Sequence, residues 1–354
     1  MKSKDIHRQP LKGGKFLNYA TAEAAHLHDM GRFGVARNHA CATRRFAEFL
    51  QSIGKQEVSF AKMKPALMAD FEGWMKSRGI CRNTSSCYLR SLSAIWNKAV
   101  REGLAEGNPF HGTYRGVART RKRSVDIDSI RRLQLLDIES CLTHHGQKSI
   151  CPQLRRHINR LQFARDLFLF SFCCRGITFI DMAFLKKSDV SGPVLSYVRR
   201  KTGQLIHVYV EPLMSDIIRR HPTRSRNPYL LPILTELHDE RLMYRQYQNA
   251  IHLYNKSLSE LGTLLGGLKL TSYVSRHSWA TTAHQQCLPV SVISQALGHD
   301  NLRTTEIYLK SLDGDLIDKA DHALLEQVFR KDEAKKIAGN HPAINPKVLS
   351  SHSI

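Results

Sequence analysis

The stretch QALGHDNLRTTEIYLKS, residues Gln295–Ser311, decides how the chain is interpreted. Gly298 follows an apolar run and ends a predicted helix, because glycine readily adopts the left-handed backbone that closes helices. His299 comes next, and Tyr308 lies nine residues further on, within a predicted helix over 302–311. A tyrosine on an amphipathic helix usually packs in a core. Whether Tyr308 is buried or reactive therefore depends on the other side chains of the chain.

The composition favours a polyanionic partner. The 354 residues include 53 Lys and Arg against 31 Asp and Glu, which gives a formal net charge of +22. An excess of this size is typical of proteins that bind nucleic acid, and a basic protein without that role is the alternative. The length is sufficient for two domains with separate cores.

Nothing in the sequence predicts export or membrane insertion. No apolar run approaches the roughly 18–20 residues of a membrane span, and the basic N-terminus lacks the apolar centre of a signal peptide. The eight cysteines are scattered without CxxC spacing, which predicts reduced thiols and no structural zinc. We therefore expect a cytoplasmic protein that makes no membrane contact.

Residues 16–110 predict a small helical domain, preceded by a flexible basic N-terminus over 1–15. Three amphipathic segments indicate it: CATRRFAEFLQSIG, ALMADFEGWMKSRG and TSSCYLRSLSAIWNKAVREGL. Thr84 is the expected N-cap of the third helix, and no strand pattern is present. The residues expected to face the core are Ala42, Phe46, Phe49, Leu50, Ile53, Leu67, Phe71, Trp74, Met75, Tyr88, Leu92, Ile95, Trp96 and Ala99.

Residues 111–126 predict an exposed basic linker. Glycine and polar residues surround its charges, and no apolar period is present. Such a linker could lie along a phosphate backbone and let two domains close around a duplex, and a solvated spacer is the alternative. The expected DNA-binding residues are Arg115, Arg119, Arg121, Lys122 and Arg123.

Residues 127–330 predict a second domain of mixed, mostly helical structure. LRRHINRLQFARDLFLFSFCCRGI predicts a long helix with Phe163, Leu167 and Phe170 inward. PVLSYVRRKTGQLIHVYV predicts a β-hairpin of strands 194–200 and 205–210.

The remaining elements of this domain are predicted to be helical. Apolar residues from Tyr247 to Leu265 are spaced 4, 3, 4, 3, 4, which indicates a helix. Shorter helices are expected over 275–286 and 290–297, and an amphipathic helix over 316–329. A polar tail covers 331–354.

The second domain contains the side chains that phosphodiester chemistry needs. Arg175 follows a buried-looking run and Arg276 stands at a helix start. Two guanidinium forks can clamp the non-bridging oxygens of a phosphate without a metal. Basic neighbours would also lower the pKa of a tyrosine such as Tyr308 from about 10. Lys201 is at the hairpin tip, and a mobile lysine on a hairpin is suited to protonate a leaving 5′-oxygen.

Four motifs carry a resemblance to a known family. RGITFIDMAFLKKSDV, RRKTGQ, TSYVSRHSWAT and ALGHDNLRTTEIYL resemble successive motifs of the tyrosine recombinase, or phage integrase, family. The form is similar to mobile-element integrases and invertases of Bacteroides-type bacteria. The resemblance covers nearly the whole chain, because the first helices look like the family's SAM-like core-binding domain.

The resemblance implies a mainly α, two-domain clamp around DNA that cuts and rejoins strands. It implies Tyr308 as the nucleophile that holds one strand as a 3′-phosphotyrosyl ester, Arg276 as the second clamping arginine, Lys201 as the general acid and His299 as a hydrogen-bond partner of the scissile phosphate. No metal and no cofactor is implied, because the ester stores the energy of the broken bond.

The resemblance also implies the partners. They are double-stranded DNA recombination sites, a homotetramer in the synaptic complex with a monomer or weak oligomer off DNA, and, in some systems, accessory DNA-bending proteins. In this interpretation the helix over 316–329 docks into a neighbouring protomer, and packing on its own domain is the alternative.

The sequence departs from the family pattern in two places. The family usually has histidine three residues before the second arginine, but Tyr273 stands there. Tyr273 could hydrogen-bond a phosphate oxygen but is a poor general base near pH 7. The first arginine usually lies three residues before an acidic residue, but Thr178 precedes Asp181 at that distance. We expect Arg175, about one helical turn further back, to fill the role, and Asp181 to pack or to orient an arginine.

Three other functions fit parts of the sequence. A DNA-binding regulator without strand cleavage is favoured by the changes at Tyr273 and Arg175. A metal-dependent nuclease or transposase would use Asp181, Asp189 or Asp216. A type IB topoisomerase would share the tyrosine chemistry.

Overall fold

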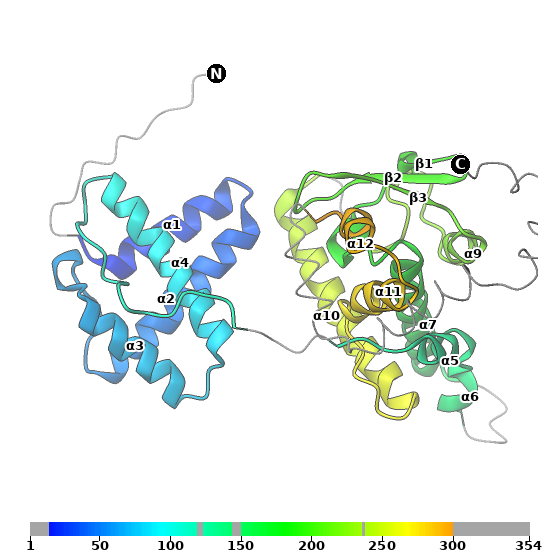
Figure 1. Cartoon of the computed structure of the whole chain (residues 1–354), viewed down its shortest axis with the longest axis horizontal. Coiled ribbons are helices and arrows are strands. Elements are labelled where there is room, and N and C mark those ends of the chain that lie inside the picture. The colour runs from blue at the N-terminus through cyan, green and yellow to red at the C-terminus, as the bar shows by residue number, and fades with distance from the viewer. Residues whose placement is uncertain (1–13, 119–122, 144–149, 236–237, 300–354) are drawn as a thin grey trace, which may run out of the picture. The chain divides into compact units, whose positions relative to one another are not determined.

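The computed structural model describes residues 14–118, 123–143, 150–235 and 238–299. These residues form two compact units (Figure 1). The N-terminal unit holds the described residues up to 118 together with 238–245, and the C-terminal unit holds the rest. Helices dominate the described residues, and a single sheet of three strands accompanies them. The predicted mainly α fold with a small hairpin sheet is confirmed.

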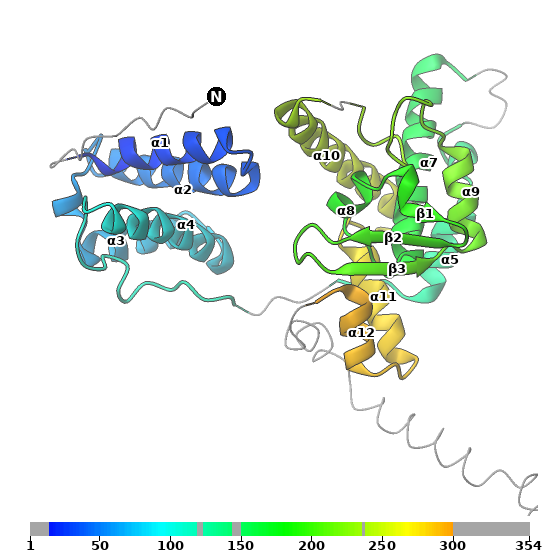
Figure 2. The ribbon, with the colours of Figure 1, turned by 90° about the horizontal axis from the view of Figure 1, so that it is seen from above.

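The N-terminal unit is a bundle of amphipathic helices. In Figure 2, α1 and α2 lie side by side, and α3 lies beside α4. Their inward faces form one apolar core that includes Phe46, Phe71, Leu92 and Trp96, all of which are fully buried. The helices are α1 (Phe16–Asp29), α2 (Phe33–Ser52), α3 (Pro65–Ser77) and α4 (Arg82–Arg101), with the short 3-10 helix η1 (Phe60–Lys62).

Two predictions for this unit are wrong at helix ends. Ile53 is not in the core: it follows the end of α2 and is 43% exposed, because the chain has left the helical path there. Thr84 is not the N-cap of α4. The helix begins one residue after Cys81, whose extended backbone accepts from the Thr84 and Ser85 N–H groups.

The first half of the predicted linker is bound to α4. The Asn83 side chain exchanges two hydrogen bonds with the Ala118 backbone, of 2.9 and 2.7 Å. The Ser86 hydroxyl donates to the Gly116 carbonyl at 2.5 Å, and the Arg82 guanidinium lies 3.8 Å from the Tyr114 ring centre. Residues 114–118 are therefore a docked segment and not a solvated spacer.

The C-terminal unit combines packed helices with a small antiparallel sheet. Its helices are α5 (Ile127–Leu135), α6 (Ile138–Leu142), α7 (Pro152–Cys173), α8 (Phe179–Ala183), α9 (Pro212–Arg220), α11 (Val274–Gln285) and α12 (Val290–Leu297), with the 3-10 helix η2 (Lys187–Asp189). It also holds residues 246–264 of α10 (Glu240–Leu264), whose first residues belong to the N-terminal unit. Its strands are β1 (Val190–Ser191), β2 (Val194–Val198) and β3 (Leu205–Tyr209). The predicted helices over 302–311 and 316–329 lie outside the described residues.

The predicted hairpin is present as β2 and β3. Tyr197 pairs with Ile206 and Leu195 with Val208, and these four side chains are buried while their neighbours are more exposed. This alternation is the reason the hairpin is readable from sequence. The strand order is β1-β2-β3, and β1 was missed because two residues carry no period.

A buried carboxylate joins α7 to α9. Asp166 is 1% exposed and accepts from Arg165 at 3.1 Å, Arg220 at 2.7 Å and His221 at 2.8 Å. Burial acts to raise the pKa of Asp166, but the His221 hydrogen bond and the two arginine charges hold it below its usual value. These four residues, called the Asp166 cluster below, are a structural ion network.

Two chain-wide expectations can be compared with the structure. All eight cysteines are free thiols, as predicted. None of the described helices combines the length and the apolar character that crossing a bilayer requires.

Candidate active site

Arg276 joins three segments that are distant in sequence. It lies in the first turn of α11 and is 3% exposed. Its guanidinium donates to the Gly176 carbonyl at 2.8 Å and to the Leu297 carbonyl at 2.6 Å, and lies 3.1 Å from His299 Nε2. These three acceptors carry no formal charge, and together they fix the orientation of the guanidinium.

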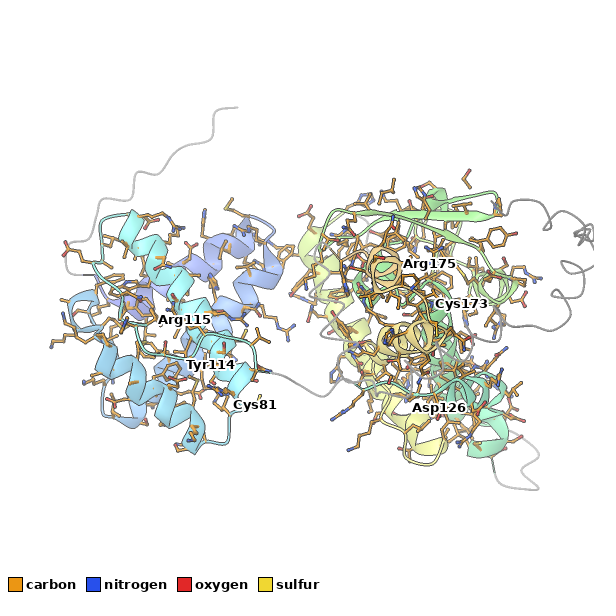
Figure 3. All side chains as sticks on the ribbon, in the orientation of Figure 1. Cys81, Tyr114, Arg115, Asp126, Cys173 and Arg175 are labelled. Atoms are coloured by element: carbon orange, nitrogen blue, oxygen red, sulfur yellow. The ribbon has the colours of Figure 1, made fainter. Side chains whose placement is uncertain are left out.

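The segment beside Arg276 has an unusual helix end. After α7, the Arg175 N–H donates to Phe172 and the Gly176 N–H donates to Ser171, which is the Schellman pattern. Arg175 has φ 55°, at the position where glycine is usual, and Figure 3 labels it there. A side chain held in this conformation costs roughly 1 kcal/mol.

Gly176 allows the close approach of α11. A Cβ atom at Gly176, where φ is +73°, would lie 2.6 Å from the Arg276 Cα. Only glycine fits both the backbone conformation and the space. Gly176 therefore determines how closely Arg276 can approach the segment that follows α7.

The expected geometry around Arg175 is wrong in one respect. Arg175 and Thr178 do not share a helical turn, because α7 has ended and Thr178 is the N-cap of α8. Asp181 is buried and does not orient an arginine side chain. It accepts from the Thr178 hydroxyl at 2.6 Å and from the Arg200 backbone N–H at 2.9 Å, so it anchors the hairpin turn.

His299 is fixed from both sides. Gly298 closes α12 in the left-handed conformation, with φ 63° and ψ 47°, and the His299 N–H donates to the Ser294 carbonyl at 3.0 Å. Burial is the main cause that lowers the pKa of His299 to about 4, and nearby positive charges act in the same direction. A neutral imidazole whose Nε2 accepts from Arg276 carries its proton on Nδ1, where it is a hydrogen-bond donor.

The hairpin brings Lys201 to the same place. Lys201 lies in the turn between β2 and β3 and is exposed, and its charge contributes to the lowered pKa of His299. The turn contacts the end of α12, because Arg199 donates to the Gly298 carbonyl and the Thr202 hydroxyl lies 3.3 Å from the same oxygen. Arg199, 5% exposed, is a residue that sequence reasoning missed.

Tyr273 lies at the edge of this group. It is the residue before α11, its ring is 51% exposed, and its centre lies 6.0 Å from the His277 ring centre. Tyr308, the expected nucleophile, lies outside the described residues. The structure thus brings together Arg276, His299 and the segments carrying Arg175 and Lys201, whereas Tyr273 is half exposed.

The expected DNA-binding residues are only partly described. Arg115 donates to the Ser93 hydroxyl of α4 at 3.0 Å (Figure 3), whereas Arg123 is exposed. The chain after Arg123 is anchored near the site, since the Val125 N–H donates to the Ser278 hydroxyl at 2.9 Å. Arg119, Arg121 and Lys122 lie outside the described residues.

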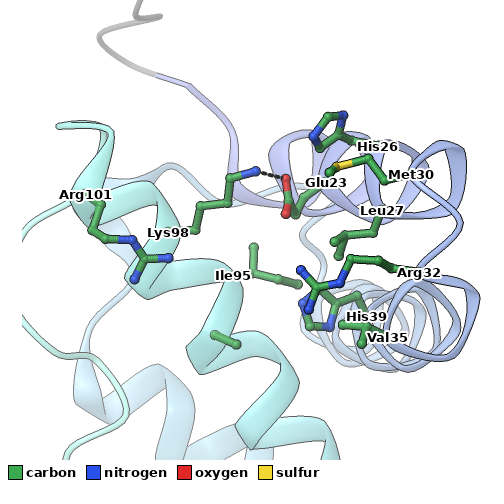
Figure 4. Close-up of a pocket in the computed structure, with 11 residues that line it drawn as sticks. Glu23, His26, Leu27, Met30, Arg32, Val35, His39, Ile95, Lys98 and Arg101 are labelled. Atoms are coloured by element: carbon green, nitrogen blue, oxygen red, sulfur yellow. Dashed lines mark hydrogen bonds and ion pairs between the residues drawn. The ribbon is translucent and has the colours of Figure 1, made fainter. Parts of the chain in front are cut away.

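The N-terminal unit has a basic pocket of ≈ 430 Å³ between α1, α2 and α4 (Figure 4). Glu23, 6% exposed, is paired with Lys98. Burial lowers the pKa of His39 on the same wall. The basic side chains that line the pocket are His26, Arg32, His39, Lys98 and Arg101.

The described residues offer little to a metal ion. They contain no group of three or more His, Cys, Asp or Glu side chains that could hold one. Each aspartate that the metal-dependent alternative would use binds another group. Asp181 accepts from the backbone of the hairpin turn, and Asp189 accepts from the Lys186 N–H at 2.8 Å. Asp216 pairs with the Arg219 guanidinium.

Comparison with known proteins gives consistent matches in both units. Residues 15–116 match the family described as phage integrase SAM-like domain, and residues 200–314 match the phage integrase family. The chain is 30% identical over 267 residues to the tyrosine recombinase XerA of Pyrococcus horikoshii, which covers 69% of this chain and 88% of the relative.

Two solved structures have a similar fold. An integrase of the transposon Tn1549, in complex with a circular intermediate DNA, matches with TM-score 0.55 and 13% identity, over 87% of this chain and 99% of that chain. A lambda integrase tetramer bound to a Holliday junction matches with TM-score 0.53 and 12% identity, over 86% of this chain and 82% of that chain. At these identities the likeness concerns the fold.

Proposed function

Because the chain belongs to the tyrosine recombinase family of phage integrases, we propose that it cuts and rejoins DNA at specific sites through a 3′-phosphotyrosyl bond to Tyr308. The observation that carries the proposal is the placement of Arg276. It is buried, it is held by two carbonyls and an imidazole, and it stands at the end of α12, from which the chain continues towards Tyr308.

The proposed cleavage step needs only groups of this chain. The Tyr308 oxygen bonds to phosphorus as the bond from phosphorus to the 5′-oxygen breaks, and the phenolic proton passes to water. Lys201 gives a proton to the leaving 5′-oxygen. Arg276 and Arg175 clamp the non-bridging oxygens and stabilise the charge of the transition state, while His299 donates from Nδ1. Rejoining reverses the step, with the 5′-hydroxyl of another strand as the attacking group.

The two units would have different roles, one in DNA binding and one in strand cleavage. We propose that the N-terminal unit, with residues 16–110, and the basic segment 111–126 bind the DNA backbone, and that residues 127–330 carry the chemistry. Arg123 and the basic wall of the pocket in Figure 4 are suited to phosphate contacts.

Recombination would require several copies of the chain on two DNA sites. We propose a homotetramer in the synaptic complex, and a product that is an integrated, excised or inverted segment of a mobile element. The lambda integrase tetramer on a Holliday junction has a similar fold, which supports such an assembly.

Removal of the tyrosine hydroxyl tests the proposal. The substrate is a nicked duplex chosen by its binding to the protein from random-sequence DNA. The wild-type chain should form a covalent adduct in excess EDTA. Tyr308→Phe should bind the duplex equally well and form no adduct. If Tyr308→Phe recombined normally, the proposal would be wrong.

One observation favours a second candidate function. Tyr273, where the family resemblance implies a catalytic histidine, is half exposed at the edge of the site. A DNA-binding regulator that never cleaves would tolerate this change. The same nicked duplex separates the two, because a regulator would bind it and leave no adduct.

A further inference from the structure

Arg199 is a buried arginine inside the hairpin. It continues the inward face of β2 after Leu195 and Tyr197, and it is 5% exposed. It donates to the Gly298 carbonyl, and its buried Nε has no hydrogen-bond partner among the described residues. Burying a guanidinium with an unused donor costs free energy.

The Gly298 turn is packed closely against the hairpin. A Cβ atom at Gly298 would lie 2.8 Å from Ile206 Cδ1, and 3.1 Å from both Arg199 Cδ and Gln204 Oε1. The glycine therefore allows the carbonyl that Arg199 binds to approach β2 and β3. The contact joins residues 99 positions apart in sequence, so it fixes tertiary structure.

Two arginines bind successive carbonyls at the end of α12, those of its last residue and of its C-cap. Arg276 donates to Leu297 and Arg199 donates to Gly298. Cations are favourable at this end of a helix, where carbonyls lack partners within the helix. His299 follows directly, and the charges of both arginines contribute to its lowered pKa.

The backbone on each side of Lys201 is tied down. The Arg200 N–H donates to Asp181 at 2.9 Å, and the Thr202 hydroxyl lies 3.3 Å from the Gly298 oxygen. Arg199 closes the turn itself, because its carbonyl accepts from Gly203 at 2.7 Å. Of the two contacts that hold the turn to the end of α12, the one from Arg199 is made by a charged donor.

We propose that Arg199 is a positioning residue that fixes the Lys201 turn against Gly298, so that the lysine faces the leaving 5′-oxygen. The proposal rests on the proposed function. Loss of Arg199 would affect Lys201 more than His299, because His299 keeps its bonds to Ser294 and Arg276. The defect should therefore appear in protonation of the leaving group.

A sulfur-containing substrate isolates that step. A duplex with sulfur in place of the bridging 5′-oxygen releases a thiol with a pKa of about 8.5, which leaves without a proton donor. Adduct formation is measured on this duplex and on the ordinary one for the wild-type chain, Arg199→Ala and Arg199→Lys. Arg200→Ala is the matched control, because its side chain is exposed and stacks on Phe184 at 4.1 Å.

We expect Arg199→Ala to form adduct about 100-fold more slowly on the ordinary duplex, and less than about fivefold more slowly on the sulfur duplex. Arg199→Lys should form adduct at least about tenfold faster than Arg199→Ala on the ordinary duplex, because the lysine ammonium can donate to the same carbonyl. Arg200→Ala should stay within about threefold of wild type.

Equal slowing of Arg199→Ala on both duplexes would overturn the positioning role, and so would a rate like that of Arg200→Ala. In both cases the wild-type chain still forms adduct and the proposed function stands. A wild-type chain without adduct on either duplex would overturn the proposed function and, with it, this inference.

Discussion

Two groups of basic side chains in the C-terminal unit use their charge in different ways. In the Asp166 cluster, two arginines and a histidine surround one buried carboxylate. In the second group, called the Arg276 cluster, Arg276 and Arg199 donate to backbone carbonyls at the end of α12. The Arg276 cluster consists of Arg175, Arg199, Lys201, Arg276 and His299.

The difference lies in the acceptors. A carboxylate neutralises the guanidinium that it binds, whereas a carbonyl orients the guanidinium without adding a negative charge. Asp181 is close to the Arg276 cluster in sequence and space, but it binds a hydroxyl and a backbone N–H. The Asp166 cluster thus pairs its charges within the protein, and we propose that the Arg276 cluster binds the scissile phosphate.

The largest loss of adduct formation should come from replacing the guanidinium of Arg276 by an ammonium. Arg276→Lys keeps the charge but loses the fork, so adduct formation should fall by about 100- to 1000-fold. The matched exchange in the other cluster, Arg165→Lys, should leave the rate within about threefold. Rates on the nicked duplex check both, and similar losses in the two variants would remove the distinction between the clusters.

Substitution in the Asp166 cluster should lower the free energy of unfolding. Asp166→Asn leaves buried cations without their carboxylate, which should cost about 3 kcal/mol of the free energy of unfolding. Asp128→Asn, in an exposed pair with Arg131, should cost less than about 1 kcal/mol. Urea unfolding measures both. A stable Asp166→Asn protein with slowed cleavage would contradict the assignment.

Arg175 should show opposite effects on stability and cleavage. Glycine is the usual residue at its backbone conformation, so Arg175→Gly should leave stability unchanged or raise it by up to about 1 kcal/mol. Adduct formation should fall by about 100-fold because one phosphate clamp is lost. Thermal unfolding and the nicked duplex test this. A variant that is less stable and fully active would indicate a structural arginine.

The smallest effect concerns pH. The folded protein lowers the pKa of His299 to about 4, whereas the unfolded value is about 6.5. Between these values only the unfolded chain binds the proton, so stability falls as pH drops through this window. The wild-type chain should lose about 1 kcal/mol more than His299→Gln between pH 7.5 and 5.5. Equal losses in urea unfolding at the two pH values would contradict the lowered pKa.

The sequence predicted local structure better than it predicted contacts. The hairpin and α12 were readable because alternation and a closing glycine are local signals. The contacts of Arg276 with Gly176 and Leu297 could not be predicted from sequence, because they span 100 and 21 residues. Arg175 was assigned to a helical turn because its motif gave no sign of the left-handed backbone at φ 55°.

Arg199 was within reach of sequence reasoning. Leu195 and Tyr197 are the inward residues of β2, and the same period of two places Arg199 inward. A charged residue at an inward strand position predicts a specific partner. The sequence does not reveal its acceptor, the Gly298 carbonyl, because this contact spans 99 residues.

The most direct test of the central claim identifies the tyrosine that holds the DNA. The trapped adduct is digested with protease and nuclease, and the masses of its tyrosine-containing peptides are measured. We predict a residual nucleotide on the peptide with Tyr308, joined through a 3′-phosphate. A nucleotide on the peptide with Tyr273, or cut DNA without any modified tyrosine, would contradict the account.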